Sequence, residues 1–314
     1  MSNTFSTLTD LAKINDRSIA DLEISDLLDD APFFKHLAAE PSSNGTEHKY
    51  TKETGAPVVG FRAPNVGRDL SKSTDTLVTL QLKILDAGFA VDKAVADAYR
   101  GGPEAWIARE GRRHIKAAFA KGEGSILNGD SGASFDGLRQ AMPYLDTPGV
   151  VNAAGNTANQ QSSIYLVRTN GDGNDVTLIG ANQGGDGIDI AMGETVVQVM
   201  PDGSGKPLPM YYTPVSTWLG LQVGGKYSIV RIANIGAATA VDDDMIYAAL
   251  AEFPTGRQPN LILMNRQHLK KLRQSRTATN ATGAPAPRPA DVDGIPIIVT
   301  DFLTQTEPVV GASP

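Results

Sequence analysis

The 314-residue sequence contains no cysteine. This absence excludes disulfide bonds, thiolate metal sites and cysteine nucleophiles together. Aromatic residues are also scarce at 6%, whereas glycine is somewhat frequent with 32 residues. We therefore expect extra stability to come from packing or association, and a fold rich in loops and strands rather than a helical bundle.

Export and membrane signals are absent as well. Residues 1–13 are polar and lack the basic start and apolar core of a secretory signal, and no run of about eighteen apolar residues occurs. We expect a protein that is soluble and intracellular when it is made. The net charge of -7 and the pI near 5.1 argue against a chain built as a whole to bind nucleic acid, which leaves a locally basic face open.

What is present is the composition of a folded protein. Hydrophobic residues make up 41% of the chain and charged residues 20%, so wholesale disorder is not expected. The length allows one large domain or two modest ones, with a substantial core.

An N-terminal arm is the first predicted part. Residues 1–30 are polar apart from a short stretch of helical spacing at 19–28. The adjacent aromatics Phe33 and Phe34, which follow Pro32, are typical of an anchor that docks on another surface.

A long two-stranded hairpin is predicted next, from strands at 48–54, 58–62 and 76–85. In the last strand four apolar residues alternate with polar ones, which is typical of a half-buried strand. These residues are Val78, Leu80, Leu82 and Ile84. The polar stretch at 63–73 predicts a flexible tip. Because an isolated hairpin is marginally stable in water, we expect it to lie on another surface.

Two helices are predicted after the hairpin, at 86–100 and at 103–121, separated by two glycines. Pro103 suits the first turn of the longer helix. From residue 100 to 121 six basic residues stand against Glu104 and Glu110, a local charge of +4. One side of this helix is therefore predicted to face an anion.

The remaining residues alternate strands, glycine-rich turns and helices. Strands are predicted at 164–168, 176–179, 194–200, 218–223, 227–235, 261–264 and 295–301, and helices at 242–253 and 265–275. Asp242 or Asp243 and Asn265 are the predicted helix caps. Residues 147–161 are predicted to form a loop, and 277–289 an extended, exposed linker.

Signatures of catalysis are missing. The histidines His36, His48, His114 and His268 fall in four different segments without metal-ligand spacing, and no nucleophile elbow or Walker-type loop occurs. We expect no enzyme activity, no catalytic residue, no metal and no cofactor.

Three motifs are similar to ligand-binding sites but are better explained by ordinary structural roles. Residues 184–192 match one calcium-binding nonapeptide, and 170–175 begin like an EF-hand loop, but the first lacks tandem copies and the second lacks the required glycine and glutamate. Tight turns explain both better. The basic run at 266–276 is better explained as a solvated helix face than as a phosphate site. It contains Arg266, Lys270, Lys271, Arg273 and Arg276.

The order of these parts resembles the major capsid proteins of tailed bacteriophages, which have the Hong Kong 97-like fold. Strings that are similar to the family lie at 48–62, 74–86, 126–138 and 218–235, and they include Asn128-Gly129-Asp130 followed by Asp136-Gly137-Leu138. The resemblance covers about 46–300. Some members join subunits through a lysine–asparagine bond, but neither partner can be matched here, so no crosslink is predicted.

The resemblance implies an α+β fold in five parts. These are an arm at 1–44, an extended loop at 45–85, a peripheral domain with a spine helix at 86–145, a mainly axial domain at 146–301 with a β-rich insertion around 163–225 and return strands to the peripheral domain, and a tail at 302–314. It also implies a subunit of the icosahedral head. The implied partners are copies of the chain in hexamers and pentamers, packaged double-stranded DNA, a portal protein, and scaffolding or decoration proteins, with no membrane.

Two sets of site residues follow from this interpretation. The predicted subunit interface contains Val78, Leu80, Leu82, Ile84, Phe61, Arg62, Phe33 and Phe34, with the alternating apolar face lying across the spine helix of the next subunit. The residues predicted to face DNA or acidic neighbours are Arg109, Arg112, Arg113 and Lys116. The expected location is the virion after synthesis in the host cytoplasm. The alternatives are a phage tail or decoration protein and, third, a calcium-dependent enzyme.

Overall fold

The computed structural model describes residues 31–129, 132–170, 173, 175–181, 193–202, 204–225, 227–278 and 287–314. The helical stretch predicted at 19–28 and the nonapeptide motif at 184–192 lie outside these residues. The linker predicted at 277–289 is described only at its two ends, and the motif at 170–175 only in part.

A six-stranded mixed sheet dominates the C-terminal half. Its order is β14 (Asp291–Val292), β15 (Ile295–Val299), β13 (Leu261–Met264), β7 (Ile164–Val167), β12 (Ile229–Ala233) and β6 (Val150–Asn152). Helices α5 (Asp243–Leu250) and α6 (Arg266–Ala278) pack on it through an apolar cluster that includes Ile246 and Leu272. The predicted caps are confirmed, because Asp242 accepts from the amide of Met245 at 3.0 Å and Asn265 from that of His268 at 2.8 Å.

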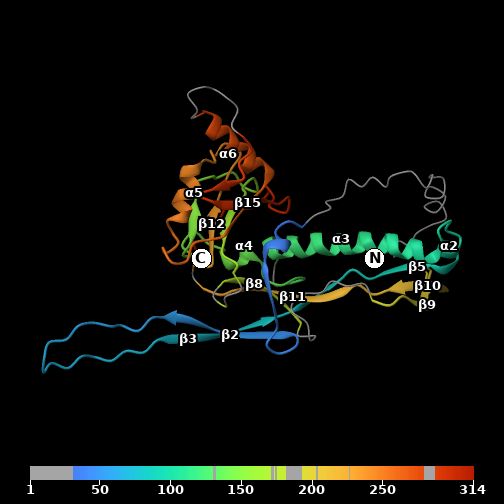
Figure 1. Ribbon diagram of the computed structural model, residues 1–314, viewed down its shortest axis with the longest axis horizontal. Coiled ribbons are helices and arrows are strands. Elements are labelled where there is room, and N and C mark those ends of the chain that lie inside the picture. Colours follow the sequence, from blue (N-terminus) through green and yellow to red (C-terminus); the bar gives the residue numbers. More distant parts are fainter. Residues whose placement is uncertain are drawn as a thin grey trace.

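Helix α3 (Gly102–Asn128) is the longest element and leaves the sheet at its base, as Figure 1 shows. The prediction ended it at residue 121, where Lys121-Gly122 and Gly124 looked like the start of a turn. The helix continues because these glycines meet aromatic rings: a Cβ on Gly122 would lie 3.0 Å from Phe34, and one on Gly124 would lie 3.3 Å from Phe302. The last turns are buried beside the short helix α4 (Leu138–Ala141).

At the far end of α3 lies a three-stranded sheet of β5 (Phe89–Asp92), β10 (Pro207–Thr213) and β9 (Val196–Pro201). The helix predicted at 86–100 is wrong, because β5 and the short helix α2 (Lys93–Asp97) divide that segment. Phe89 and Val91 are buried while their neighbours are half-exposed, which is the alternation of a strand. Asp92 then caps α2 by accepting from the amide of Ala94 at 2.9 Å.

A four-stranded sheet of β1 (Ala38–Pro41), β8 (Val176–Gly180), β11 (Ser216–Val223) and β4 (Lys83–Asp86) lies below the six-stranded sheet. The strand predicted at 76–85 is therefore two strands. It breaks at Leu82, so that β3 (Thr74–Gln81) pairs with β2 (Glu47–Gly55) and β4 pairs with β11.

The β2–β3 hairpin projects far from the body (Figure 1). The strand predicted at 58–62 is wrong, because no regular strand continues β2 beyond Gly55. Pro57 and Pro64, which lack the amide donor that a ladder needs, flank this stretch. Other predicted strands in the second half are confirmed to within a few residues, whereas β1, β6, β10 and β14 were not predicted.

Candidate assembly surfaces

The base of the hairpin rests on its own subunit. A Cβ on Gly220 of β11 would lie 2.5 Å from Leu82 and 3.0 Å from Leu80, so the glycine permits a very close approach of the two side chains. The amide of Leu82 also donates to the carbonyl of Thr46 at 3.0 Å. Leu82 is 4% exposed, so its assignment to the interface between subunits is corrected.

The alternating apolar face does not run through to Ile84. Val78 and Leu80 are half-buried on the subunit's own side, whereas Ile84 belongs to β4 and is exposed. The irregular residue at Leu82 moves β4 into another sheet and turns the following side chains. The prediction of a single face that awaits a neighbour is therefore wrong, although Ile84 itself remains open to one.

The distal part of the hairpin carries the most fully exposed of the described large apolar side chains. Phe61 is fully exposed at 109% and Leu70 at 95%, and Val58, Val59 and Val66 accompany them. Arg62 donates to the carbonyl of Val66 at 3.3 Å, and Arg68 donates to the carbonyls of Gly60 and Val58. These arginines join the two limbs where strand pairing is absent. We call residues 56–73 the tip.

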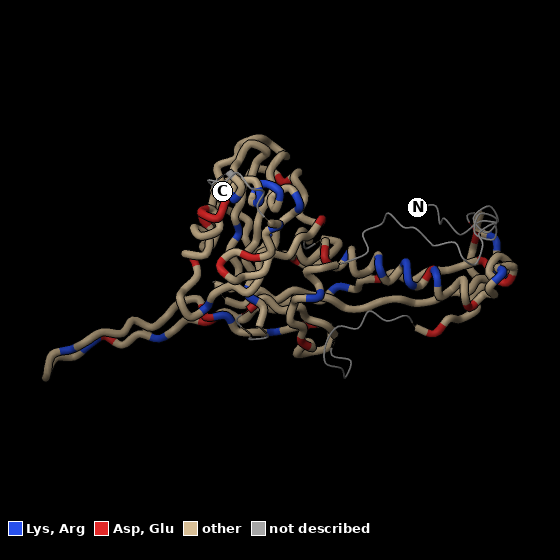
Figure 2. Tube along the Cα trace, turned by 45° about the horizontal axis from the view of Figure 1, so that its top comes forward, with Lys and Arg blue, Asp and Glu red and all other residues tan. Residues whose placement is uncertain are grey.

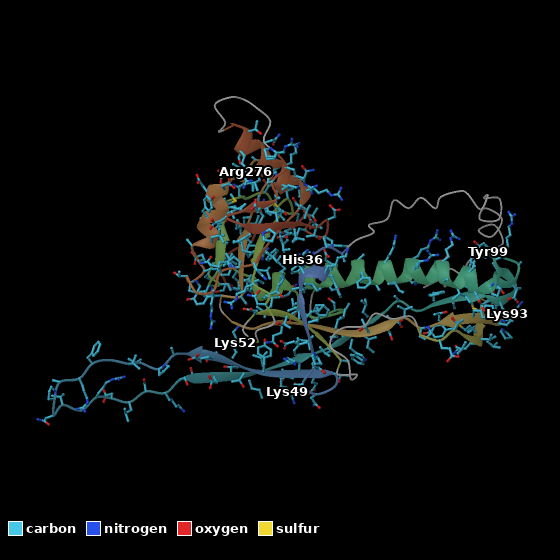
Figure 3. All side chains as sticks on the ribbon, in the orientation of Figure 1. His36, Lys49, Lys52, Lys93, Tyr99 and Arg276 are labelled. Atoms are coloured by element: carbon cyan, nitrogen blue, oxygen red, sulfur yellow. The ribbon has the colours of Figure 1, made fainter. Side chains whose placement is uncertain are left out.

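Phe33 and Phe34 anchor the chain to α3 of their own subunit. Phe33 is 0% exposed, and Phe34 meets Phe119 of α3 edge-on with 5.4 Å between ring centroids. Phe33 is buried within its own subunit, so its assignment to the interface between subunits is corrected, whereas for the half-buried Phe34 that assignment stays a prediction. The short helix η1 (Phe34–His36) follows, and Figure 3 shows His36 there beside α3.

Glu123 of α3 is a polar centre that the sequence interpretation missed. Its buried carboxylate accepts from the amides of Phe33 at 3.0 Å and Phe34 at 3.3 Å, and from the hydroxyl of Thr300. Burial raises the pKa of Glu123, and these hydrogen bonds oppose the rise. One side chain thus joins the arm, the long helix and the end of β15. In the sequence, Glu123 is an acid three residues before the apolar pair Ile126 and Leu127, and nothing in that spacing predicts that its side chain is buried.

The basic residues of α3 are placed on its surface as predicted from the sequence, and Figure 2 shows Lys and Arg positions along the helix. Arg112, Arg113 and Lys116 are exposed. Arg113 pairs with Glu110 at 3.1 Å, and Arg109 lies over the ring of Trp106 at 5.9 Å. Whether the stripe meets DNA stays a prediction.

The basic run on α6 separates into two groups. Arg276 pairs with Asp243 at 2.8 Å, and Lys271 donates to the carbonyls of Gly236 at 2.8 Å and Thr239 at 3.0 Å, so both hold the fold together. Figure 3 labels Arg276 on α6. Arg266, which pairs with Asp301 at 2.7 Å, lines a groove together with Lys270 and Arg273.

Among the described residues, neither a metal-binding cluster nor a membrane-spanning helix is found. Within the ranges that the structure covers, no group of three or more histidines and acids is placed to hold a metal ion. Asp175, part of the EF-hand-like motif, pairs with Arg168 at 2.9 Å. No described helix is both long and apolar enough to cross a bilayer.

This combination of a projecting hairpin, a long helix and a mixed sheet domain defines the class of shell-forming phage capsid subunits. The family model for Major capsid protein GP7 matches residues 16–311. The chain belongs to this family and is therefore a structural protein of a phage head shell, with an α+β fold of the Hong Kong 97-like type.

Solved structures agree in fold. The chain is similar to one from bacteriophage Epsilon15, with 22% identity, a TM-score of 0.73 and 99% of each chain covered. It is also similar to the capsid of bacteriophage JBD30, with 12% identity, a TM-score of 0.51, and 95% of this chain and 100% of that chain covered. A search of curated proteins gives no match. As a member of a capsid family, the chain is assigned to the virion and to self-assembly.

Proposed function

We propose that the chain tiles an icosahedral head around double-stranded DNA by docking its hairpin tip on neighbouring copies within and between hexamers and pentamers. The single observation that carries this proposal is the exposure of Phe61, Leu70 and the three valines of the tip. Contiguous apolar side chains on a thin projection are costly in water and are typical of a surface that a partner covers. In a shell built of one subunit, that partner is another copy.

Charge limits where the tip docks. Residues 58–72 carry Arg62, Arg68 and Lys72 against Asp69, so the tip is basic. The exposed Arg112, Arg113 and Lys116 of α3 would repel it, since like charges destabilise a contact. We therefore place the contact away from that stripe, at the far end of the long helix, where Asp92, Asp97 and Glu104 outnumber Lys93 and Arg100 and the local charge is -1.

The parts of the subunit have corresponding proposed roles. Residues 1–44 are the arm, 45–85 the extended loop, 86–145 the peripheral domain with its spine helix, 146–301 the mainly axial domain, and 302–314 the tail. Two observations support this division: β9 and β10 pair with β5 rather than with the six-stranded sheet, and β8 and β11 form a separate sheet. The segment 163–225 thus supplies strands to three sheets.

Variants of the tip test the proposal. Replacing Phe61 and Leu70 by serine should leave the free energy of unfolding of the unassembled chain unchanged, because neither side chain is buried in the subunit. Shell formation, measured by light scattering and electron microscopy, should fall sharply. Ser73→Ala is the matched control at the base of the tip. Normal shells from the double variant would overturn the proposal.

We further propose that Arg109, Arg112, Arg113 and Lys116 face the packaged DNA, because phosphate contacts use such basic stripes. Replacing Arg112 and Arg113 by glutamine should change the salt dependence of genome retention in assembled heads. Unchanged particles would contradict this role.

The other proposed partners are a portal protein and scaffolding or decoration proteins. Synthesis in the host cytoplasm and the lack of a catalytic role belong to the same proposal.

A further inference from the structure

A groove runs along α6 at the edge of the six-stranded sheet. It has a volume of about 620 Å³, and its described lining contains four cations and no acid: Arg266, Lys270, Arg273 and Arg288. Leu269, Pro289 and Val299 form its apolar part. Figure 2 shows Lys and Arg positions close together around α6. One of these cations, Arg266, forms an ion pair with Asp301, with 2.7 Å between Nη2 and Oδ2.

The cations form a row because of helical spacing. Arg266, Lys270 and Arg273 stand at i, i+4 and i+7, which places them on one face of α6 over about 10 Å. Arg288 approaches from a segment beyond the helix, a juxtaposition that the sequence did not predict. A ligand for this groove should therefore be an elongated anion with apolar groups of its own.

The chain contains such a segment. Residues 19–30 include five acids, Asp21, Glu23, Asp26, Asp29 and Asp30, five large apolar residues, Ile19, Leu22, Ile24, Leu27 and Leu28, and no lysine or arginine. Its acids match the cations of the groove, and its leucines and isoleucines match the apolar lining.

The segment is also tethered close to the groove. Glu123 accepts from the amide of Phe33 and from the hydroxyl of Thr300, so the start of the described chain lies beside the end of β15. The two neighbours of Thr300 belong to the groove: Val299 lines it, and Asp301 forms the ion pair with Arg266. Twelve residues span about 18 Å as a helix and about 40 Å when extended, so 19–30 can reach the whole row.

We propose that residues 19–30 bind the α6 groove of their own chain, with the acids paired to Lys270, Arg273 and Arg288 and the apolar side chains against Leu269 and Val299. The tether makes this binding intramolecular, which raises the effective concentration of the segment. The contact would hold the arm against the axial domain until a competing anion or a neighbouring subunit displaces it.

The natural absence of cysteine gives a clean test. In the full chain, Ser25→Cys is combined with Gln274→Cys beside Arg273 on α6, and the matched control combines Ser25→Cys with Ala248→Cys at an exposed position of α5. With oxidised glutathione as the two-electron oxidant, the first pair should form an intrachain disulfide about tenfold faster than the equally tethered control, because docking raises the local concentration of the two thiols. Raising salt to about 1 M, where the Debye length is about 3 Å, should remove most of the difference.

Charge reversal completes the test. Adding Lys270→Glu and Arg273→Glu should slow the crosslink about tenfold, whereas Arg112→Glu with Arg113→Glu, an equal change in net charge, should not. Equal rates for the two cysteine pairs would overturn the proposal, as would a disulfide-linked dimer, which would assign the groove to another copy's arm. An unchanged crosslink, together with loss of duplex DNA binding in fluorescence anisotropy, would assign the groove to nucleic acid instead. Because the assay reads the unassembled chain, it is independent of shell formation.

Discussion

Arg231 and Glu307 form a buried ion pair, with 2.8 Å between Nη2 and Oε2 and each side chain at most 2% exposed. Arg231 also donates to the hydroxyl of Ser163 at 3.0 Å and to the carbonyl of Met142 at 2.8 Å. Glu307 exchanges two backbone hydrogen bonds with Gln161. The C-terminal tail is therefore fixed to β12 and to the connection before β7.

Glu307→Ala should lower the free energy of unfolding by about 3–5 kcal/mol, because it leaves the Arg231 guanidinium buried without its counter-ion. Urea unfolding of the unassembled chain, followed by tryptophan fluorescence, measures this. Ser313→Ala, which removes one exposed hydrogen bond to Asp146, is the control and should change stability little. A Glu307→Ala effect no larger than the control's would show that the pair does not hold the tail.

Gly220→Ala should push the hairpin base off β11, because its Cβ would meet Leu82 at 2.5 Å and Leu80 at 3.0 Å. We expect a loss of about 1–3 kcal/mol, as for other overpacked sites, and fewer closed shells. Gly256→Ala, where no atom lies within 4 Å of the added Cβ, serves as the control. Wild-type stability and assembly of Gly220→Ala would contradict the close packing.

Glu123→Leu should free the start of the described chain, because three donors lose their buried acceptor. Each unsatisfied buried donor costs about 1–3 kcal/mol. Limited trypsin digestion after Lys35 should therefore become faster, and Glu110→Leu on the same helix should leave it unchanged. If both variants resist trypsin equally, Glu123 does not secure the arm.

His268 predicts a pH dependence. Burial, with Lys271 nearby, lowers its pKa to about 3, so the folded chain keeps the neutral imidazole while the unfolded chain takes up a proton near pH 6.5. The stabilising contribution is complete above about pH 6.5 and is lost as the pH falls toward 3, by a few kcal/mol in total.

His268→Leu should remove this contribution. The difference in unfolding free energy between the wild-type chain and the variant should shrink as the pH falls from about 7 to about 4. Urea titrations at several pH values measure it. A difference that stays constant with pH would show that His268 protonates equally in both states.

Sequence patterns predicted the elements whose periodicity is local. The strand at 261–264 is apolar throughout because both faces are buried, and the helices at 242–253 and 265–275 carry cap residues that hydrogen-bond as expected. The alternation through Leu82 and Ile84 led to the wrong prediction of one continuous strand, because alternation alone does not show which strands pair with each other. The strand breaks there because Ile84 pairs with Trp218 of β11, which lies 134 positions further along the chain.

The surfaces were harder to predict than the elements. Phe33 and Phe34 were identified as an anchor, but their partner on α3 lies about 90 residues away, joined through Glu123. Arg288 enters the α6 groove from across a segment that no local pattern connects to it. Long-range contacts of this kind leave no mark in spacing or composition, whereas residues 63–73 of the exposed tip were predicted as a polar stretch between strands.

Electron microscopy of the purified full-length chain under assembly conditions tests the central claim most directly. We predict closed icosahedral particles, or hexameric and pentameric rings, in which the tips of residues 56–73 lie on neighbouring copies. A chain that stays monomeric under all assembly conditions, or particles in which the tips touch no neighbour, would contradict the account.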